Sequence, residues 1–181
     1  MVCTYSPQVS ELERHAEAFA RESGKVTATE IKDMVPMGFA NLGWQPVKGG
    51  TIGMCYYPAF GNKGKIEVDT SFWVQASETK RRGLMWHEFG HCVCGLGHTV
   101  EIGQLEPNWF IKFLHRLGIK TARNRDFYLE DGCPTSLMHP LLPSEECLDK
   151  HWDRYKSQII KSCRPFGLYK LLESFDLYKS L

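Results

Sequence analysis

The chain has 181 residues, enough for one domain with a substantial hydrophobic core. Apolar residues make up 43% of the sequence and charged residues 24%, proportions that are typical of a globular protein and exclude a disordered or fibrous chain. A formal net charge of +1 gives no reason to expect a nucleic acid or an anionic membrane as a partner. We therefore expect a single domain over residues 1–181.

The N-terminal residues predict an amphipathic helix. Apolar side chains recur there at intervals of three and four, at Val9, Leu12, Ala16 and Phe19. Ser6 and Pro7 are suited to begin this helix, and Ser23-Gly24 to end it. Prolines and glycines interrupt the next stretch, which predicts only short strands, for example over residues 44–47.

Two neighbouring strands are predicted in the middle of the chain. Residues 51–57 are rich in strand-forming side chains and stop at Pro58, and residues 65–73 alternate apolar with polar positions. The sequence Gly61-Asn62-Lys63-Gly64 between them is typical of a turn, so the two strands are expected to pair.

Three helices are predicted in the remainder. Ser77 or Thr79 can cap a helix that runs to Cys94 and stops at Gly95. An apolar stripe predicts a core-facing helix over residues 107–117, in which His115 is more easily explained by packing or exposure than by metal binding. A last helix is predicted from near Ser144 to about Ser162.

The sequence of the first of these helices carries a metal-binding pattern. His87 and His91 are four residues apart, so both imidazoles project from one face at a separation suited to a single tetrahedral Zn²⁺ ion. Glu88 is offset by about 100° around the helix and can reach a water molecule on the metal without binding the metal itself. We expect Glu88 to act as general base on that water and then as general acid towards the leaving amine.

A third ligand follows the helix. Gly95 can adopt a positive φ that reverses the chain, and His98 can then return to the metal. Three protein ligands leave a fourth coordination position open for water, as in catalytic zinc sites. His87, His91 and His98 are therefore the expected ligands of one catalytic ion.

These residues resemble a known family. His87 to His98 is similar to the metzincin signature His-Glu-x-x-His-x-x-Gly-x-x-His, and Ser-Leu-Met-His-Pro at residues 136–140 resembles the Met-turn beneath the metal in those enzymes. The likeness is greatest to matrixins, the matrix-metalloproteinase type, and includes residues 68–73 ahead of the helix. It covers roughly residues 51–140.

The resemblance implies an α+β, zincin-like fold. Residues 1–98 would form an upper lobe with a small twisted mixed sheet and the zinc helix. Residues 99–181 would form a lower lobe that contains the Met-turn and, after it, a mainly helical C-terminal part. Residues 51–57 would be the edge strand that pairs with an extended substrate. Met138 would form an apolar floor with no catalytic role, and His139 is not assigned as an oxyanion stabiliser.

The chain departs from the matrixin pattern in three ways. One extra residue separates His91 from Gly95, which a π-bulge or a changed helix end would have to absorb. If it is not absorbed, Glu101, Glu106 or Asp131 is an alternative third ligand. A long insertion also separates His98 from the Met-turn, and no inhibitory pro-segment is evident.

The cysteines and the N-terminus bear on location. Seven cysteines at irregular spacings do not indicate a disulfide framework, and Cys92 and Cys94 point in different directions on the predicted helix, so buried thiols are the favoured interpretation. The first 22 residues lack the apolar stretch of a signal peptide, and no segment is long enough to span a bilayer. A cytoplasmic protein, or one carried in a viral particle or other assembly, is expected.

The sequence thus supports two functions. The leading hypothesis is a zinc metallopeptidase with a polypeptide substrate and with Glu88 as the catalytic residue. The alternative is a non-catalytic structural or binding protein with a zincin fold, such as a virion component, whose cleft holds a protein partner. Retention of Glu88 favours the enzyme, because metal binding alone does not need that carboxylate.

Overall fold

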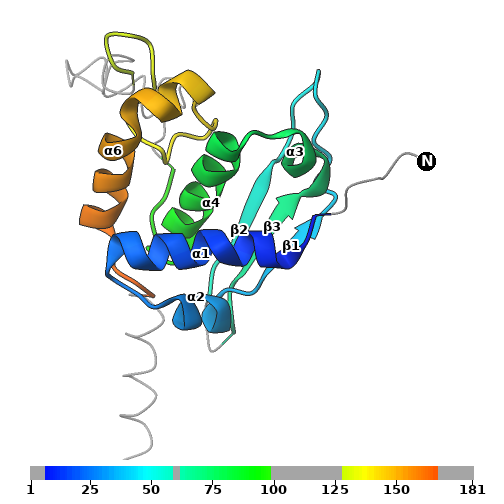
Figure 1. Cartoon of the computed structure of the whole chain (residues 1–181), viewed down its shortest axis with the longest axis vertical. Helices are drawn as coiled ribbons and strands as arrows, with labels where there is room; N and C mark the ends of the chain where they lie inside the picture. Colours follow the sequence, from blue (N-terminus) through cyan, green and yellow to red (C-terminus); the bar gives the residue numbers. More distant parts are fainter. Residues whose placement is uncertain (1–6, 59–61, 99–127, 167–181) are drawn as a thin grey trace, which may run out of the picture.

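A small mixed sheet forms one side of the molecule. The computed structural model describes residues 7–58, 62–98 and 128–166, and within them the fold is α+β (Figure 1). The strands β1 (Met37–Ala40), β2 (Gly53–Tyr56) and β3 (Lys65–Asp69) are arranged in the order β1-β3-β2. Central β3 pairs in parallel with β1 and antiparallel with β2, so β2 lies at an edge.

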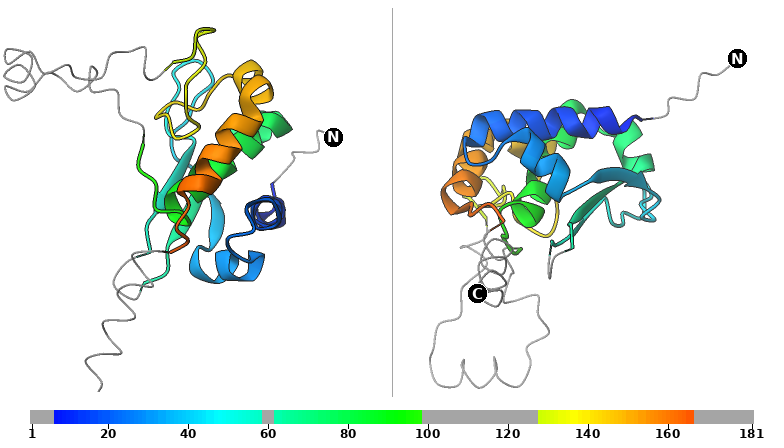
Figure 2. Two further views of the ribbon diagram at one scale, coloured as in Figure 1. Left: turned by 90° about the vertical axis from the view of Figure 1, so that its left-hand side faces the viewer. Right: turned by 90° about the horizontal axis from the view of Figure 1, so that it is seen from below.

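The helices pack beside the sheet and around one another. They are α1 (Val9–Ser23), α2 (Ala28–Met34), α3 (Thr70–Gln75), α4 (Glu78–Cys92) and α6 (Glu145–Ser162). In Figure 1, α1 crosses in front of α4, and α6 lies on the side of α4 away from the sheet; Figure 2 gives two further views. No helix among the described residues has the length and apolar character needed to cross a membrane.

Helix α4 lies in the interior of the molecule. Every residue from 83 to 92 is buried, because α1, α6 and β2 all pack against this helix. Phe19 of α1 contacts Trp86 and Phe89, with ring centroids 4.7 and 5.1 Å away. A helix that is buried all round is held by packing on every face, so its side chains occupy fixed positions.

Most of the predicted elements are present, with changes at their ends. Ser77, one of the two predicted caps, caps α4, and Ser144, where the last helix was predicted to start, caps α6; each accepts a backbone N–H. The first helix is instead capped by Gln8 in a capping box with Glu11, and Ser6 lies outside the described residues. The strand predicted over residues 65–73 ends at Asp69, because that carboxylate caps α3.

Other short elements differ from the prediction. Helix α2 was not predicted. The short strand of this stretch is β1, whereas residues 44–47, given as the example, form only an isolated bridge between Gln45 and Gly49. The helix predicted over residues 107–117, together with His115, lies outside the described residues. The long insertion after His98 falls largely in the same part of the chain.

The cysteines correct a prediction. Six of the seven form disulfides, in the pairs Cys55–Cys92, Cys94–Cys163 and Cys133–Cys147. Cys92 and Cys94 are buried as expected, but the expectation that they are reduced thiols is wrong. The side chains of Cys92 and Cys94 do point in different directions, as predicted. Cys92 bonds to Cys55 in β2, and Cys94 bonds to Cys163, the residue after α6. Disulfides persist in oxidising surroundings, so the cysteines no longer support the expected cytoplasmic location.

Candidate metal centre

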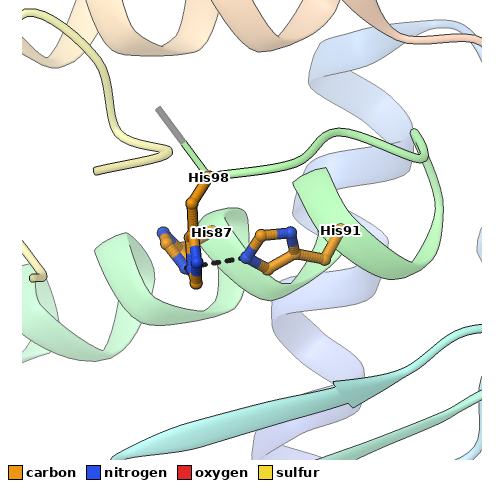
Figure 3. A group of neighbouring side chains, drawn as sticks. All are labelled: His87, His91 and His98. Carbon is orange, nitrogen blue, oxygen red and sulfur yellow. Dashed lines mark hydrogen bonds between the residues drawn. The ribbon is translucent and has the colours of Figure 1, made fainter. Parts of the chain in front are cut away.

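Three imidazoles meet at one point beside α4. The Nε2 atom of His87 lies 3.0 Å from Nε2 of His91 and 3.2 Å from Nε2 of His98. Figure 3 shows His98 reaching back over the helix from the chain that follows it. Ligand nitrogens about 2.0 Å from a tetrahedral zinc ion are separated by roughly 3.3 Å. The histidine nitrogens are therefore spaced as a tetrahedral ion requires.

The end of α4 accommodates the extra residue of the motif. Leu96 N–H donates to Gly90 O in a 7→1 hydrogen bond of 2.9 Å, where a Schellman closure has a 6→1 bond. Inside this turn, Gly95 N–H donates to His91 O, and Gly95 has a φ of +70° that favours glycine. The added residue thus widens the closing turn of the helix and leaves His98 facing the other two histidines.

Backbone carbonyls orient the two helical histidines. Nδ1 of His87 lies 2.7 Å from Leu137 O, and Nδ1 of His91 lies 2.6 Å from Leu96 O. Since a carbonyl oxygen only accepts hydrogen bonds, each Nδ1 carries the proton and donates. In the neutral rings both Nε2 atoms then present lone pairs to one another. Metal-binding histidines commonly donate their other ring N–H to a backbone carbonyl in this way, which fixes the tautomer and the orientation of the ring.

Burial keeps these rings uncharged. It lowers the pKa of His87 to about 3, and it also lowers the pKa values of His91 and His98. The facing lone pairs are therefore not bridged by a proton at neutral pH. A divalent cation that prefers imidazole ligands fits this donor set.

Glu88 places a carboxylate beside the histidines. The residue is 3% exposed, and its Oε2 atom has no hydrogen-bond partner among the described residues. Burial raises the pKa of Glu88 to about 8. An ionisable group with a strongly shifted pKa in a cavity is a common feature of catalytic sites.

A glycine in the edge strand makes room for this carboxylate. A Cβ atom at Gly53 would lie 2.5 Å from Oε1 of Glu88 and 2.9 Å from the Leu84 side chain. Any larger residue in this position of β2 would therefore displace the carboxylate. The sequence analysis did not identify Gly53, although an isolated glycine within a strand pattern is a signal of close approach.

The segment that resembles a Met-turn packs against α4. Ser136 Oγ accepts the Met138 N–H at 3.1 Å and so closes a tight turn. The Met138 sulfur lies against Gly90, where an added Cβ would be 2.5 Å from it. Leu137 of the same turn supplies the carbonyl that binds His87. The turn therefore forms a buried floor and also orients one of the histidines.

Both ring nitrogens of His139 have partners outside the histidine cluster. It is 5% exposed, and its Nδ1 atom accepts the Leu141 N–H at 3.1 Å. Its Nε2 atom lies 3.1 Å from the hydroxyl of Tyr128. These contacts give His139 a place in the structure of the turn, and no catalytic role is assigned to it.

The candidate site opens into a cavity of about 550 Å³. The three histidines and Glu88 form one part of its wall, and β2 and the residues after the Met-turn form the rest. Tyr57 also lines it, with its hydroxyl 3.3 Å from Nδ1 of His91 and 3.4 Å from Leu96 O. Burial, followed by the charge of Glu88, raises the pKa of Tyr57.

Asp131, the alternative third ligand that lies within the described residues, is not part of this cluster. Asp131 instead accepts a hydrogen bond from His151 at 2.8 Å and pairs with Lys150 at 2.6 Å. The cysteine nearest to it, Cys133, is in a disulfide and cannot offer a thiolate. Glu101 and Glu106 lie outside the described residues.

No protein-family model, curated protein or solved structure matches this chain. The likeness to metzincins therefore stays a prediction from short sequence motifs. Roles for the three histidines and Glu88 depend on their geometry and chemistry.

Proposed function

We propose that this protein is a zinc-dependent metallopeptidase with a metzincin-like cleft and a zincin-type fold. His87, His91 and His98 would hold one Zn²⁺ ion. The observation that carries the proposal is the convergence of three uncharged Nε2 atoms next to the buried, unpaired carboxylate of Glu88. Three histidine ligands leave a coordination position open, which is typical of catalytic rather than structural zinc.

The residues of the chain have separate tasks in this reaction. When bound, the ion would acidify a water molecule and polarise a peptide carbonyl. Glu88 accepts the proton from the attacking water and passes it to the nitrogen of the leaving amine, so the carboxylate returns to its starting state. The carbonyls of Leu137 and Leu96 hold the His87 and His91 rings in the required tautomer.

The open edge of the sheet suits a polypeptide substrate. Strand β2 pairs only with β3 among the described strands, so its other edge can receive an extended chain. The cavity beside it contains Glu88 and the histidines. A peptide bound there would pass directly over the proposed metal position.

The test combines metal analysis with peptide cleavage. We expect the purified protein to contain about one zinc ion per chain and to cleave casein or a mixed-peptide substrate. Glu88→Gln preserves the shape of the side chain and should retain zinc while losing cleavage by roughly 10²-fold or more. Zinc binding without any Glu88-dependent cleavage would contradict the enzyme and favour a non-catalytic binding protein.

A further inference from the structure

The extra residue of the zinc motif is held by the segment that follows α6. Cys94 forms a disulfide with Cys163, the first residue after that helix. Phe166 N–H donates to Val93 O at 2.9 Å, and all four of these side chains are buried. The end of the zinc helix is thus attached to a distant part of the chain at two adjacent residues.

The third histidine depends on this attachment more than the other two. His87 and His91 are buried in α4, whereas His98 is exposed and follows a short segment with glycines at positions 95 and 97. A Cβ atom added at either glycine would meet no atom within 4 Å, so neighbouring side chains do not confine this segment. Its anchor within the helix end is Leu96, through hydrogen bonds at its N–H and carbonyl.

We propose that the Cys94–Cys163 disulfide positions His98 and makes metal affinity depend on thiol oxidation. The proposal rests on the metal site described above. It assigns a positioning function to two cysteines that contribute no ligand and lie outside the catalytic chemistry. It also gives the single-residue insertion in the motif a role, since Cys94 lies within the stretch that the insertion lengthens.

The redox step is an ordinary thiol–disulfide exchange. The thiols of Cys94 and Cys163 lose two protons and two electrons as the S–S bond forms, and a disulfide oxidant, such as glutathione disulfide, is reduced to two thiols. A dithiol reductant reverses the step. With the bond open, residues 94–98 gain conformational freedom, and metal binding must then restrict that freedom again. Loss of a partner that orients a ligand weakens metal affinity by about 10–100-fold.

A double-mutant cycle on zinc affinity tests the proposal. Affinity would be measured by competition with a chromophoric chelator for the wild type, His98→Ala, Cys94→Ala/Cys163→Ala, and the combination of all three substitutions. We expect the cysteine variant to bind zinc about 10–100-fold more weakly than the wild type. His98→Ala should then cost much less affinity in the cysteine variant than in the wild type, because the two changes act on the same ligand.

The Cys133–Cys147 disulfide provides a matched control. Its cysteines are 14 residues apart and enclose the Met-turn. Neither cysteine belongs to the segment, residues 93–98, that carries His98. In Cys133→Ala/Cys147→Ala, His98→Ala should retain its wild-type cost. If Cys94→Ala/Cys163→Ala does not fold, judged by near-ultraviolet circular dichroism, the wild type reduced by a water-soluble phosphine takes its place in the cycle.

The outcomes separate this proposal from the proposed function. Wild-type zinc affinity in the cysteine variant, or equal costs of His98→Ala in both backgrounds, would overturn the disulfide proposal and leave the peptidase intact. Disulfide-dependent zinc binding without Glu88-dependent cleavage would support this proposal and sink the peptidase. A wild-type protein that binds no zinc would overturn both.

Discussion

Glu88 owes its position to the residue opposite it on β2. Because a Cβ at Gly53 would lie 2.5 Å from Oε1, any side chain at this position would force the Glu88 carboxylate to shift. A general base must reach its water within hydrogen-bonding distance, so a small displacement of the carboxylate affects catalysis far more than folding.

Gly53→Ala should therefore lower kcat for peptide cleavage by roughly 10²-fold while zinc content stays near the wild-type value. Gly38→Ala in β1 is the matched control, since an added Cβ there meets no atom within 4 Å. Steady-state kinetics and metal analysis on both variants provide the measurement. Equal activity in the two variants would argue against a close contact between β2 and Glu88.

His15 illustrates how burial couples a side chain to pH. It is 8% exposed on α1, and burial lowers its pKa from 6.5, although Glu78 acts in the opposite direction. The unfolded chain therefore binds a proton here more readily than the folded one. Stability from neutral His15 is complete above about pH 6.5 and is lost as the pH falls towards the lower pKa of the folded state.

His15→Phe should reduce this acid sensitivity, since phenylalanine retains an aromatic ring beside Trp73 and cannot titrate. The free energy of unfolding, measured in urea on the zinc-free proteins at pH 8, 6 and 5, should fall less steeply in the variant. Parallel curves for the two proteins would show that His15 contributes nothing to the pH dependence.

Single residues of the site differ in how far sequence could predict them. The i, i+4 spacing indicates that His87 and His91 share a helix face, and Gly95 indicates a reversal before His98. The carbonyls that orient the rings come from Leu96 and Leu137, the second of which is 50 residues from its histidine. That contact depends on how the Met-turn packs under α4, which no local pattern encodes.

Asp69 links three elements at the level of secondary structure. Its carboxylate caps α3 through Phe72 N–H at 3.0 Å and accepts the Leu42 N–H at 2.7 Å from the chain that follows β1. Trp44 N–H lies 3.4 Å from the same oxygen. Asp69 itself is 1% exposed, so this hydrogen-bonded carboxylate lies in the interior of the protein.

Asp69→Ala should lower the free energy of unfolding by about 2–4 kcal/mol, because it removes the cap of α3 and also the acceptor of the Leu42 N–H. Ser77→Ala removes a cap alone, that of α4, and should cost about 1 kcal/mol. Urea denaturation of both variants gives the comparison. A similar loss in the two would mean that the contact to Leu42 adds no stability.

The same residue explains one limit of prediction at this scale. Alternation alone extends the strand to residue 73, whereas the Asp69 side chain turns the chain into α3. Helix α2 was missed because it has seven residues, of which Ile31 is the buried one, so no periodicity develops. Of the long helices, α1 was predicted from its repeating apolar pattern, and α4 and α6 from the residues that can begin or end them.

At the scale of the molecule, two disulfides involve segments that line the candidate site. Cys55–Cys92 connects the edge strand β2 to α4, and Cys133–Cys147 encloses the turn at residues 136–140. Sequence could not show this pairing, because the partners are 37 and 14 residues apart and approach only in the folded chain. A loop of about 40 residues closed by a disulfide is worth roughly 4 kcal/mol by chain entropy.

Thiol labelling should reveal this pattern directly. Alkylation of the unreduced protein in denaturant should modify no more than one cysteine, and Cys3 is the one outside the three pairs. Prior reduction should raise the number of labels to seven. Intact mass spectrometry gives both numbers, and peptide mapping identifies the pairs. Several labels without reduction would contradict the cross-linked fold.

The widened turn after α4 has a consequence for how such sites are found. A motif written as fixed intervals treats every inserted residue as a break, yet here Leu96 closes the helix on Gly90 and the third imidazole still meets the other two. Insertions at the C-terminal end of a helix can be silent in space, whereas one between His87 and His91 would rotate a ligand by about 100°. Search patterns for metal sites should therefore allow variable length at helix ends and none within the helix.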